Sequence, residues 1–224
     1  MKIAILVAME KELKQFLTLL GDPEKQEIGG RAYYVGNLGE KQIVLQQCGI
    51  GKVNSVIGTV EMIRNFSPDC IVSSGVAGGA SLSVPRLEAV VSTELVYHDA
   101  YYGSECAPGQ VLGMPERFTA DKKLVEAAKS IDGVHPGLIV SGDWFVDTKA
   151  KMGGIVDMFP EALAVDMESC SIAQVCHVYG VPFVSFRVIS DIPFDDTKAN
   201  QYYDFWDKVA AESFSITREF VEKI

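Results

Sequence analysis

The hydrophobic positions of the chain follow two spacings, which predict strands and helices in regular succession. Continuous apolar runs, typical of buried strands, occur at residues 2–8, 70–72, 87–97, 138–140, 162–166 and 182–189. Apolar residues three and four positions apart predict helices at residues 10–20, 52–66, 121–131, 167–179 and 201–223. A turn through Asn37, Gly39 and Glu40 is expected to join residues 31–37 and 42–48 into an antiparallel pair.

This alternation predicts an α/β fold in which a mixed sheet carries helices on both faces. The 224 residues contain no linker, repeat or low-complexity tract, so we expect residues 1–224 to form a single domain. Residues 99–118 follow neither spacing and are rich in Gly, Pro and Tyr. Ordered loops of this length are uncommon without a role, which makes this segment a candidate functional loop.

Composition and charge argue against two kinds of partner. The 30 acidic and 20 basic residues give a net charge of −10, and no Lys/Arg-rich run is present, so we expect no nucleic acid. The apolar start at residues 1–8 is interrupted by Glu10, Lys11 and Glu12. We therefore expect neither a membrane span nor an export signal.

The cysteine and histidine spacings predict a cytoplasmic protein without a histidine-based metal site. The five cysteines are odd in number, irregularly spaced and free of any CxxC motif, as expected of reduced thiols. The three histidines show neither HxxxH nor HxH spacing.

Polar residues collect where the predicted strands end. In open α/β sheets, ligands bind beyond the carboxyl ends of the strands. The residues at these ends are Glu12, the segment 73–79, Asp143, Asp166, Glu168, Arg187, Ser190 and Asp191. We therefore expect several acids and one arginine to converge at one edge of the sheet.

The segment 166–169 places two acids at a strand-to-helix junction among apolar residues, where burying a charge is costly. Asp166 is suited to cap the helix. Glu168 is expected inside the first helical turn, where its two oxygens can bind the vicinal hydroxyls of a sugar.

Arg187 lies within an apolar strand and requires an acidic partner. A structural ion pair with Glu168 is the simplest explanation of this arginine. Asp191 stands where the same strand emerges, and Ser190 beside it can serve simply to start a turn.

The glycine segments and the aromatic residues each have two interpretations. Residues 74–79 lack the lysine of a P-loop and do not spell GxGxxG. These residues and 48–52 either turn the chain or let a flat ligand lie against the backbone. Trp144, Phe145 and Tyr203 are either core residues or surfaces on which a purine stacks.

Seven motifs cover the chain almost end to end. They are residues 8–12, 48–53, 74–79, 97–100, 141–145, 165–168 and 187–191. In their order and spacing the chain resembles the bacterial 5′-methylthioadenosine/S-adenosylhomocysteine nucleosidases, members of the wider purine nucleoside phosphorylase superfamily. The resemblance implies a three-layer αβα sandwich around a mixed, partly barrel-like central sheet. It also implies hydrolysis of the N-ribosidic bond of these adenine nucleosides, with 5′-deoxyadenosine as a further substrate.

The same resemblance implies a homodimer, in which the loop 99–110 of one subunit completes the site of its neighbour. It implies no cofactor and no metal. By position, Glu12 is implied to activate water, Asp191 to protonate adenine at N7, and Glu168 to hold the ribose hydroxyls. The residues implied to border the substrate or to support the acids are Met9, Ile50, Gly78, Phe145, Val146, Met167, Arg187, Ser190 and Tyr203.

Two carboxyl groups suit this reaction because a purine anion is a poor leaving group. Its departure needs a proton from an acid that stays protonated near neutral pH, a state that burial favours. A second carboxylate can accept the proton of water on the opposite face of the oxocarbenium-like sugar, as in glycoside hydrolysis.

Three other functions stay open at this point. A phosphorylase would need arginines around the phosphate, and of six arginines only Arg187 falls at the expected cleft. A hydrolase of futalosine-type nucleosides, such as aminodeoxyfutalosine, would share the acids and differ in the 5′ pocket, where Tyr102 and Glu105 are unusual. A silent nucleoside-binding module is disfavoured because all three acids are present.

Three positions depart from the family pattern. Val76 stands where a serine is expected in the glycine segment, and Trp144 replaces a small residue. Glu105 replaces an apolar residue in a 99–110 loop that is shorter than usual. Val76 affects how the attacking water is held, and the loop affects which 5′ substituent is preferred.

Overall fold

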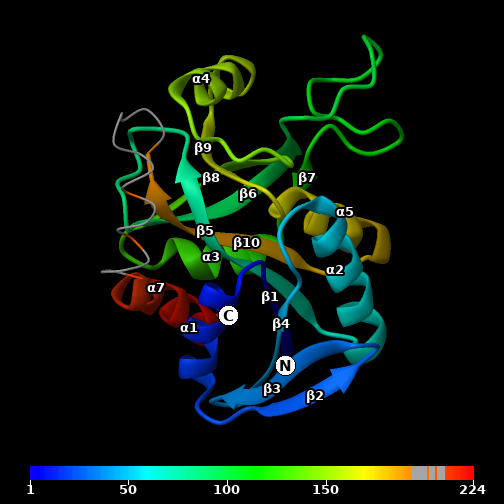
Figure 1. Ribbon diagram of the computed structural model, residues 1–224, viewed down its shortest axis with the longest axis vertical. Helices are drawn as coiled ribbons and strands as arrows, with labels where there is room; N and C mark the ends of the chain where they lie inside the picture. The colour runs from blue at the N-terminus through cyan, green and yellow to red at the C-terminus, as the bar shows by residue number, and fades with distance from the viewer. Residues whose placement is uncertain (193–200, 202–204, 206–209) are drawn as a thin grey trace.

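The structure is a computed structural model, and it describes residues 1–192, 201, 205 and 210–224. A ten-stranded mixed sheet runs through this part of the chain (Figure 1). Its strands are β1 Lys2–Val7, β2 Glu24–Ile28, β3 Arg31–Leu38, β4 Lys41–Gln47, β5 Cys70–Gly79, β6 Ala89–Tyr97, β7 Phe118–Thr119, β8 Val134–Ser141, β9 Ala162–Asp166 and β10 Phe183–Asp191. The described helices are α1 Glu10–Leu20, α2 Lys52–Phe66, α3 Lys122–Lys129, α4 Lys149–Met158, α5 Ser169–Tyr179 and α7 Ala210–Lys223.

Five of these strands close into a barrel, and the others extend the sheet away from it. The ring runs β5–β10–β6–β8–β9 and returns to β5. From β5 the sheet continues through β1, β4, β3 and β2. Parallel pairs such as β1–β5 coexist with antiparallel pairs such as β3–β4. The expected mixed, partly barrel-like sheet is therefore confirmed.

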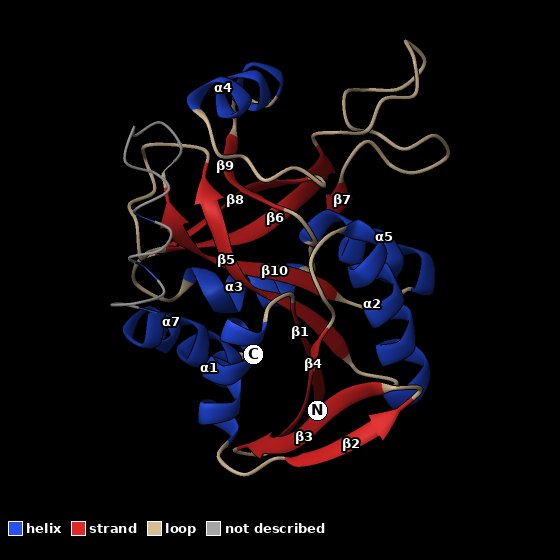
Figure 2. Ribbon diagram, viewed as in Figure 1, coloured by secondary structure: helices blue, strands red, loops and turns tan. Residues whose placement is uncertain are grey.

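Helices cover the sheet in two layers, which confirms the expected αβα sandwich (Figure 2). One layer, made of α1, α3 and α7, packs on apolar side chains of β1, β4 and β10. Aromatic contacts tie this layer together: Phe16 meets Phe214 edge-on at 5.8 Å, and Phe186 stacks on Phe220 at 4.5 Å. The other layer, made of α2 and α5, packs on the alternate side chains of the same strands.

Several elements differ from the sequence predictions. The strand expected at 70–72 continues through the glycine segment to Gly79, because β10 and β9 pair with it there. The charged edge strand β2 and the glycine-containing helix α4 were not predicted. The helix expected at 167–179 begins at Ser169, and the helix expected at 201–223 lies partly outside the described residues.

Residues 98–117 form a long loop that projects from the sheet between β6 and β7 (Figure 1). Its exposed apolar side chains include Tyr101, which is 84% exposed, and Leu112, which is 63% exposed.

Among the described residues, none of the helices combines the length and apolarity that crossing a membrane requires.

Candidate active site

A pocket opens where β1, β5, β9 and β10 end. Ten of the twelve predicted site residues line it: Met9, Glu12, Ile50, Gly78, Phe145, Val146, Met167, Glu168, Ser190 and Asp191. Arg187 lies buried behind these residues, and Tyr203 lies outside the described residues. The pocket is also lined by Ala8, Val76, Ala77, Trp144, Val165 and Asp166.

Glu12 is held in one position by the backbone around it. Its Oε2 accepts hydrogen bonds from the amides of Ala8 and Met9, both at 2.9 Å. Its Oε1 accepts one from the amide of Val76 at 3.0 Å. Burial raises the pKa of Glu12, and Arg187 and the three amides act in the opposite direction. A buried carboxylate with a raised pKa is a better proton acceptor than an exposed one.

Gly75 permits this arrangement because a side chain would not fit. Its φ is +145°, and a Cβ built there would lie 2.2 Å from Glu12 Oε1 and 2.7 Å from Arg187 Nη1. The glycine therefore lets a carboxylate and a guanidinium both approach the backbone of β5.

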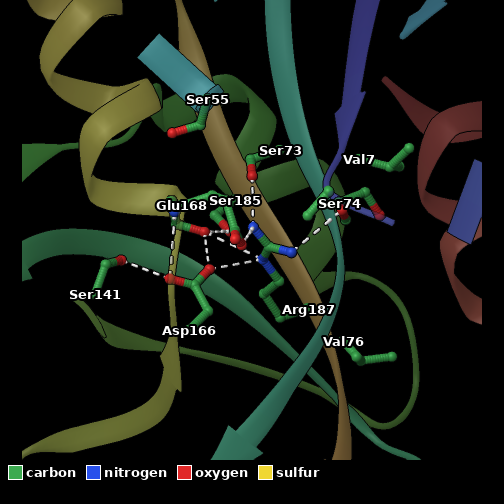
Figure 3. A network of polar contacts seen from close by, with 12 residues as sticks. Val7, Ser55, Ser73, Ser74, Val76, Ser141, Asp166, Glu168, Ser185 and Arg187 are labelled. Carbon is green, nitrogen blue, oxygen red and sulfur yellow. Dashed lines mark hydrogen bonds and ion pairs between the residues drawn. The ribbon is translucent and has the colours of Figure 1, made fainter. Parts of the chain in front are cut away.

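Arg187 is the centre of a buried polar network (Figure 3). Its Nε lies 2.8 Å from Asp166 Oδ2, and its Nη2 donates to Ser73 Oγ at 2.8 Å. Its Nη1 donates to the carbonyl of Ser74 at 3.2 Å. Arg187 Nη2 and Glu168 Oε2 are 3.7 Å apart. The expected ion pair with Glu168 is therefore secondary, and Asp166 is the principal partner.

Asp166, the last residue of β9, also binds the first turn of helix α5. Its Oδ1 accepts from the amide of Ser169 at 3.2 Å and from the hydroxyl of Ser141 at 2.5 Å. The Ser169 hydroxyl donates to the other oxygen, Oδ2. Asp166 thus accepts from the first amide of α5, as a capping residue would, but Glu168 and not Asp166 occupies the N-cap position.

Glu168 precedes the first turn of α5 rather than lying inside it, so that prediction was wrong. It occupies the N-cap position and makes no capping bond with its side chain. Its Oε1 instead accepts from the amide of Gly51, at 2.9 Å, at the start of α2. The positive end of that helix favours a carboxylate. Burial is the largest influence on Glu168 and raises its pKa.

Asp191 lies at the end of β10 and is 4% exposed. The Ser190 hydroxyl donates to Asp191 Oδ1 at 2.7 Å and lies 3.3 Å from the carbonyl of Ala77. Ser190 therefore orients the acid, which is more than the start of a turn.

The mouth of the pocket is apolar and open. Ile50 is 51% exposed, Trp144 is 51% exposed and Phe145 is 57% exposed. Behind Trp144 lies buried His98, with ring centres 5.4 Å apart, and burial lowers the pKa of this histidine. These aromatic side chains are part of the pocket wall and not of the core.

Asp143 was expected to join the converging acids, and it does not line the pocket. Its Oδ1 accepts from the amide of Lys52 at 2.8 Å, which places it on the first turn of α2. Its own amide donates to Asp99 Oδ2 at 2.9 Å, and Asp99 is paired with the ammonium of Lys52. Asp143 thus fixes the segment that carries Phe145.

The backbone donors of the site were not predicted from the sequence. The amides of Gly51 and Val76 hold Glu168 and Glu12, and nothing in the residue types at those positions marks them as donors. Among the described residues, no group of three or more His, Cys, Asp or Glu side chains is arranged to hold a metal ion.

Comparisons with known proteins agree over the whole chain. A family model described as the phosphorylase superfamily matches residues 2–222. A 5′-methylthioadenosine/S-adenosylhomocysteine nucleosidase of Desulfotalea psychrophila is 37% identical over 232 residues, covering 100% of this chain and 98% of that protein.

Solved structures give the same result. The nucleosidase of Neisseria meningitidis, in complex with methylthio-immucillin-A, superposes with a TM-score of 0.92 at 36% identity, covering 100% of this chain and 99% of that one. A futalosine hydrolase of Helicobacter pylori gives a TM-score of 0.91 at 31% identity, covering 100% and 98%. This chain belongs to the phosphorylase superfamily and, within it, to the family of the 5′-methylthioadenosine/S-adenosylhomocysteine nucleosidases.

Proposed function

We propose that this protein hydrolyses the N-ribosidic bond of 5′-methylthioadenosine and S-adenosylhomocysteine, releasing adenine and the 5′-thioribose. 5′-Deoxyadenosine is a further substrate. The observation that carries the proposal is that Glu12, Glu168 and Asp191 line one pocket, although they come from three distant parts of the chain. Three buried acids at one cavity are costly for stability and are typical of a catalytic site.

Asp191 donates a proton to N7 of adenine as the bond from C1′ to N9 breaks. The electron pair of that bond then leaves on a neutral base rather than on an anion. The hydroxyl of Ser190, 2.7 Å from Oδ1, holds the carboxyl group in a single orientation. A positioned general acid contributes on the order of 10²–10⁴ in rate.

Glu12 accepts a proton from the water that attacks C1′ from the opposite face of the sugar. Its three amide contacts keep it in place, and its raised pKa makes it a stronger base. Glu168 binds the ribose hydroxyls through its carboxyl oxygens, and their negative potential stabilises the cationic sugar of the transition state.

The remaining lining residues hold the two ends of the nucleoside. Phe145 stacks on adenine, and the backbone of Val146 hydrogen-bonds its edge. Met167 packs against the sugar, and Gly78 lets the ligand approach the backbone. The residues that border the 5′ substituent are Met9, Ile50 and Tyr203.

Water rather than phosphate is the acceptor. Neither a lysine nor an arginine is among the described residues that line the pocket. Arg187, behind the wall, is already engaged by Asp166 and three serines, and the amides around Glu12 bind the Glu12 carboxylate. A phosphate dianion would need several of these donors.

Hydrolysis of a futalosine-type nucleoside is the second candidate. The close structural similarity to the futalosine hydrolase of Helicobacter pylori favours it. Both reactions would use the same acids, so the 5′ substituent alone would separate them.

We also infer that the protein is a cytoplasmic homodimer that acts in methionine salvage. Exposed apolar side chains on α2 (Val53 is 69% exposed and Ile57 is 40% exposed) and on the loop around Tyr101 support a dimer in which loop 99–110 completes the neighbouring site. All five cysteines are free thiols, in keeping with a reducing compartment.

Incubation of the purified protein with 5′-methylthioadenosine in phosphate-free buffer tests the proposal, with free adenine as the readout. We expect adenine release that phosphate does not accelerate. Ribose-1-phosphate formed on addition of phosphate would indicate a phosphorylase, and faster turnover of aminodeoxyfutalosine would indicate the second candidate. Nucleoside binding without adenine release over hours would indicate a silent binding module.

A further inference from the structure

Strand β10 contains a bulge immediately before Asp191. Against β5, Ile189 pairs with Ala77 and Asp191 pairs with Gly78, so Ser190 is an extra residue. A bulge bends its strand and re-aims the following side chain, and it leaves backbone groups outside the ladder. The carbonyl of Ser190 therefore needs a donor from elsewhere in the chain.

Arg86 supplies that donor. Its Nε donates to the carbonyl of Ser190 at 2.9 Å, and its Nη2 donates to the carbonyl of Gln201 at 3.1 Å. Two donors of one planar guanidinium thus connect two separate segments, a geometry that lysine cannot reproduce.

The backbone that follows Arg86 holds this side chain next to β10. Leu87 has φ +74°, a left-handed conformation that is costly for a leucine. Its amide donates to the carbonyl of Ile189 at 2.9 Å, and the amide of Ile189 donates to the carbonyl of Glu88 at 2.9 Å. The segment 86–88 is therefore fastened to β10 one residue before the bulge.

Gln201 holds the other side of the acid. Its side-chain Oε1 accepts from the amide of Ile192 at 3.1 Å. Arg86 contacts the peptide group before Asp191, and Gln201 contacts the amide of the residue after it. The backbone on both sides of Asp191 is thus restrained by these two side chains.

We propose that Arg86 and Gln201 are positioning residues that hold the β10 bulge and thereby aim Asp191 at the nucleobase. The inference rests on the proposed function, because it assumes that Asp191 is the proton donor. Neither Arg86 nor Gln201 is among the described residues that line the substrate pocket, so we expect both to act through Asp191. A displacement of about 1 Å in a reacting group lowers a rate by up to about 10²-fold, so a small movement of the bulge is sufficient.

Two substrates separate positioning from general support of the fold. 5′-Methylthioadenosine needs a proton on its leaving group, whereas a 4-nitrophenyl 5-methylthioriboside leaves as a stable anion and needs none. We expect Arg86→Ala to lower kcat about tenfold for the first substrate, and to change kcat for the second less than about twofold. Gln201→Ala is expected to lower the same kcat. Arg86→Lys is expected to lower it less than Arg86→Ala does, but not to reach the wild-type value.

Two control variants give the largest loss and the background change against which Arg86→Ala is compared. Asp191→Asn sets the limit for complete loss of the acid, and Arg218→Ala removes an exposed arginine that pairs only with Glu222 among its described partners. Equal losses on both substrates in Arg86→Ala would overturn the proposal. An alkaline limb of the kcat–pH profile that is the same in Arg86→Ala as in Arg218→Ala would also overturn it. If the wild-type protein releases no adenine, the proposed function itself has failed, and this is seen before any variant is compared.

Discussion

The floor and the rim of the pocket are built in opposite ways. The floor, defined here as Glu12, Asp166, Glu168 and Asp191, is at most 7% exposed, and its oxygens accept hydrogen bonds from backbone amides, hydroxyls and a guanidinium. The rim, defined as Ile50, Trp144 and Phe145, is more than half exposed and apolar.

This difference separates chemistry from substrate selection. Dipoles and charges that are fixed before the substrate arrives stabilise a transition state without having to reorganise. An open apolar rim adds little to the bond-breaking step, and it contributes binding energy only when a ligand covers it. Changes in the floor should therefore alter kcat or stability, with an added effect on KM at Glu168, whereas changes in the rim should alter KM alone.

The largest effect is expected from Asp191→Asn. The amide retains the size of the side chain but has no acidic proton to give, so we expect nucleoside binding to persist and turnover to fall about 10³-fold. Single-turnover adenine release together with equilibrium binding of 5′-methylthioadenosine measures the two properties separately. Undiminished turnover would show that Asp191 is not the proton donor. It would also contradict the expectation that changes in the floor alter kcat.

A similarly strong effect on the floor is expected from Gly75→Ala. The new Cβ would meet Glu12 Oε1 at 2.2 Å, so the carboxylate must leave its three amides. We expect a loss of about 3 kcal/mol in the free energy of unfolding and a clear loss of turnover.

Gly113→Ala is the matched control for this variant, measured by urea unfolding. Its φ of +81° also lies in the region that favours glycine, and no atom lies within 4 Å of its Cβ position. Equal destabilisation in the two variants would mean that backbone strain alone, and not the collision with Glu12, explains the cost.

The sequence predicted the elements that have a regular spacing of apolar residues. β1 and α1 have clear apolar spacings and appear where expected. The second half of β5 consists of small residues without strand preference, and it is a strand because β10 and β9 pair with it. β2 was missed because its residues, Glu24–Ile28, are mostly charged or polar at a sheet edge.

The acids of the site were predictable for a different reason. Glu12, Glu168 and Asp191 follow strand ends, and topology brings such ends together. The partner of Arg187 was not predictable, because it depends on closure of the barrel. β9 and β10 are not neighbours in the ring, and only its curvature brings Asp166 to within 2.8 Å of the guanidinium. The contacts of Arg86 were not predictable either, because they depend on a bulge in β10 that the residue types there do not indicate.

An intermediate effect is expected from Glu168→Gln, with slower turnover and a roughly tenfold rise in KM, because one acceptor oxygen for the ribose hydroxyls is replaced by an amide donor. The substitution should also change how the free energy of unfolding depends on pH. Burial raises the pKa of Glu168 to about 8, so the folded state binds this proton more tightly than the unfolded state. That contribution is fully present below the unfolded pKa, near 4.5, and is lost as pH rises through the folded value.

Glutamine stays neutral throughout this range. The free energy of unfolding of Glu168→Gln should therefore fall less than that of the wild type between pH 5 and pH 8.5. Urea unfolding at the two pH values measures this difference. Parallel pH dependences would show that Glu168 is ionised in the folded protein at both values, and unchanged KM would discredit its assignment to the ribose.

The smallest effect is expected at the rim, from Trp144→Ala. The indole is half exposed and touches His98, so its removal should raise KM about threefold and leave kcat nearly unchanged. It should also expose His98, whose pKa is lowered by burial, and return that pKa towards the ordinary histidine value in an NMR titration. Ile28→Ala, at a partly exposed apolar position on edge strand β2, is the control. A loss in kcat rather than KM would place Trp144 with the floor, because only groups that act on the bond-breaking step change kcat at constant KM.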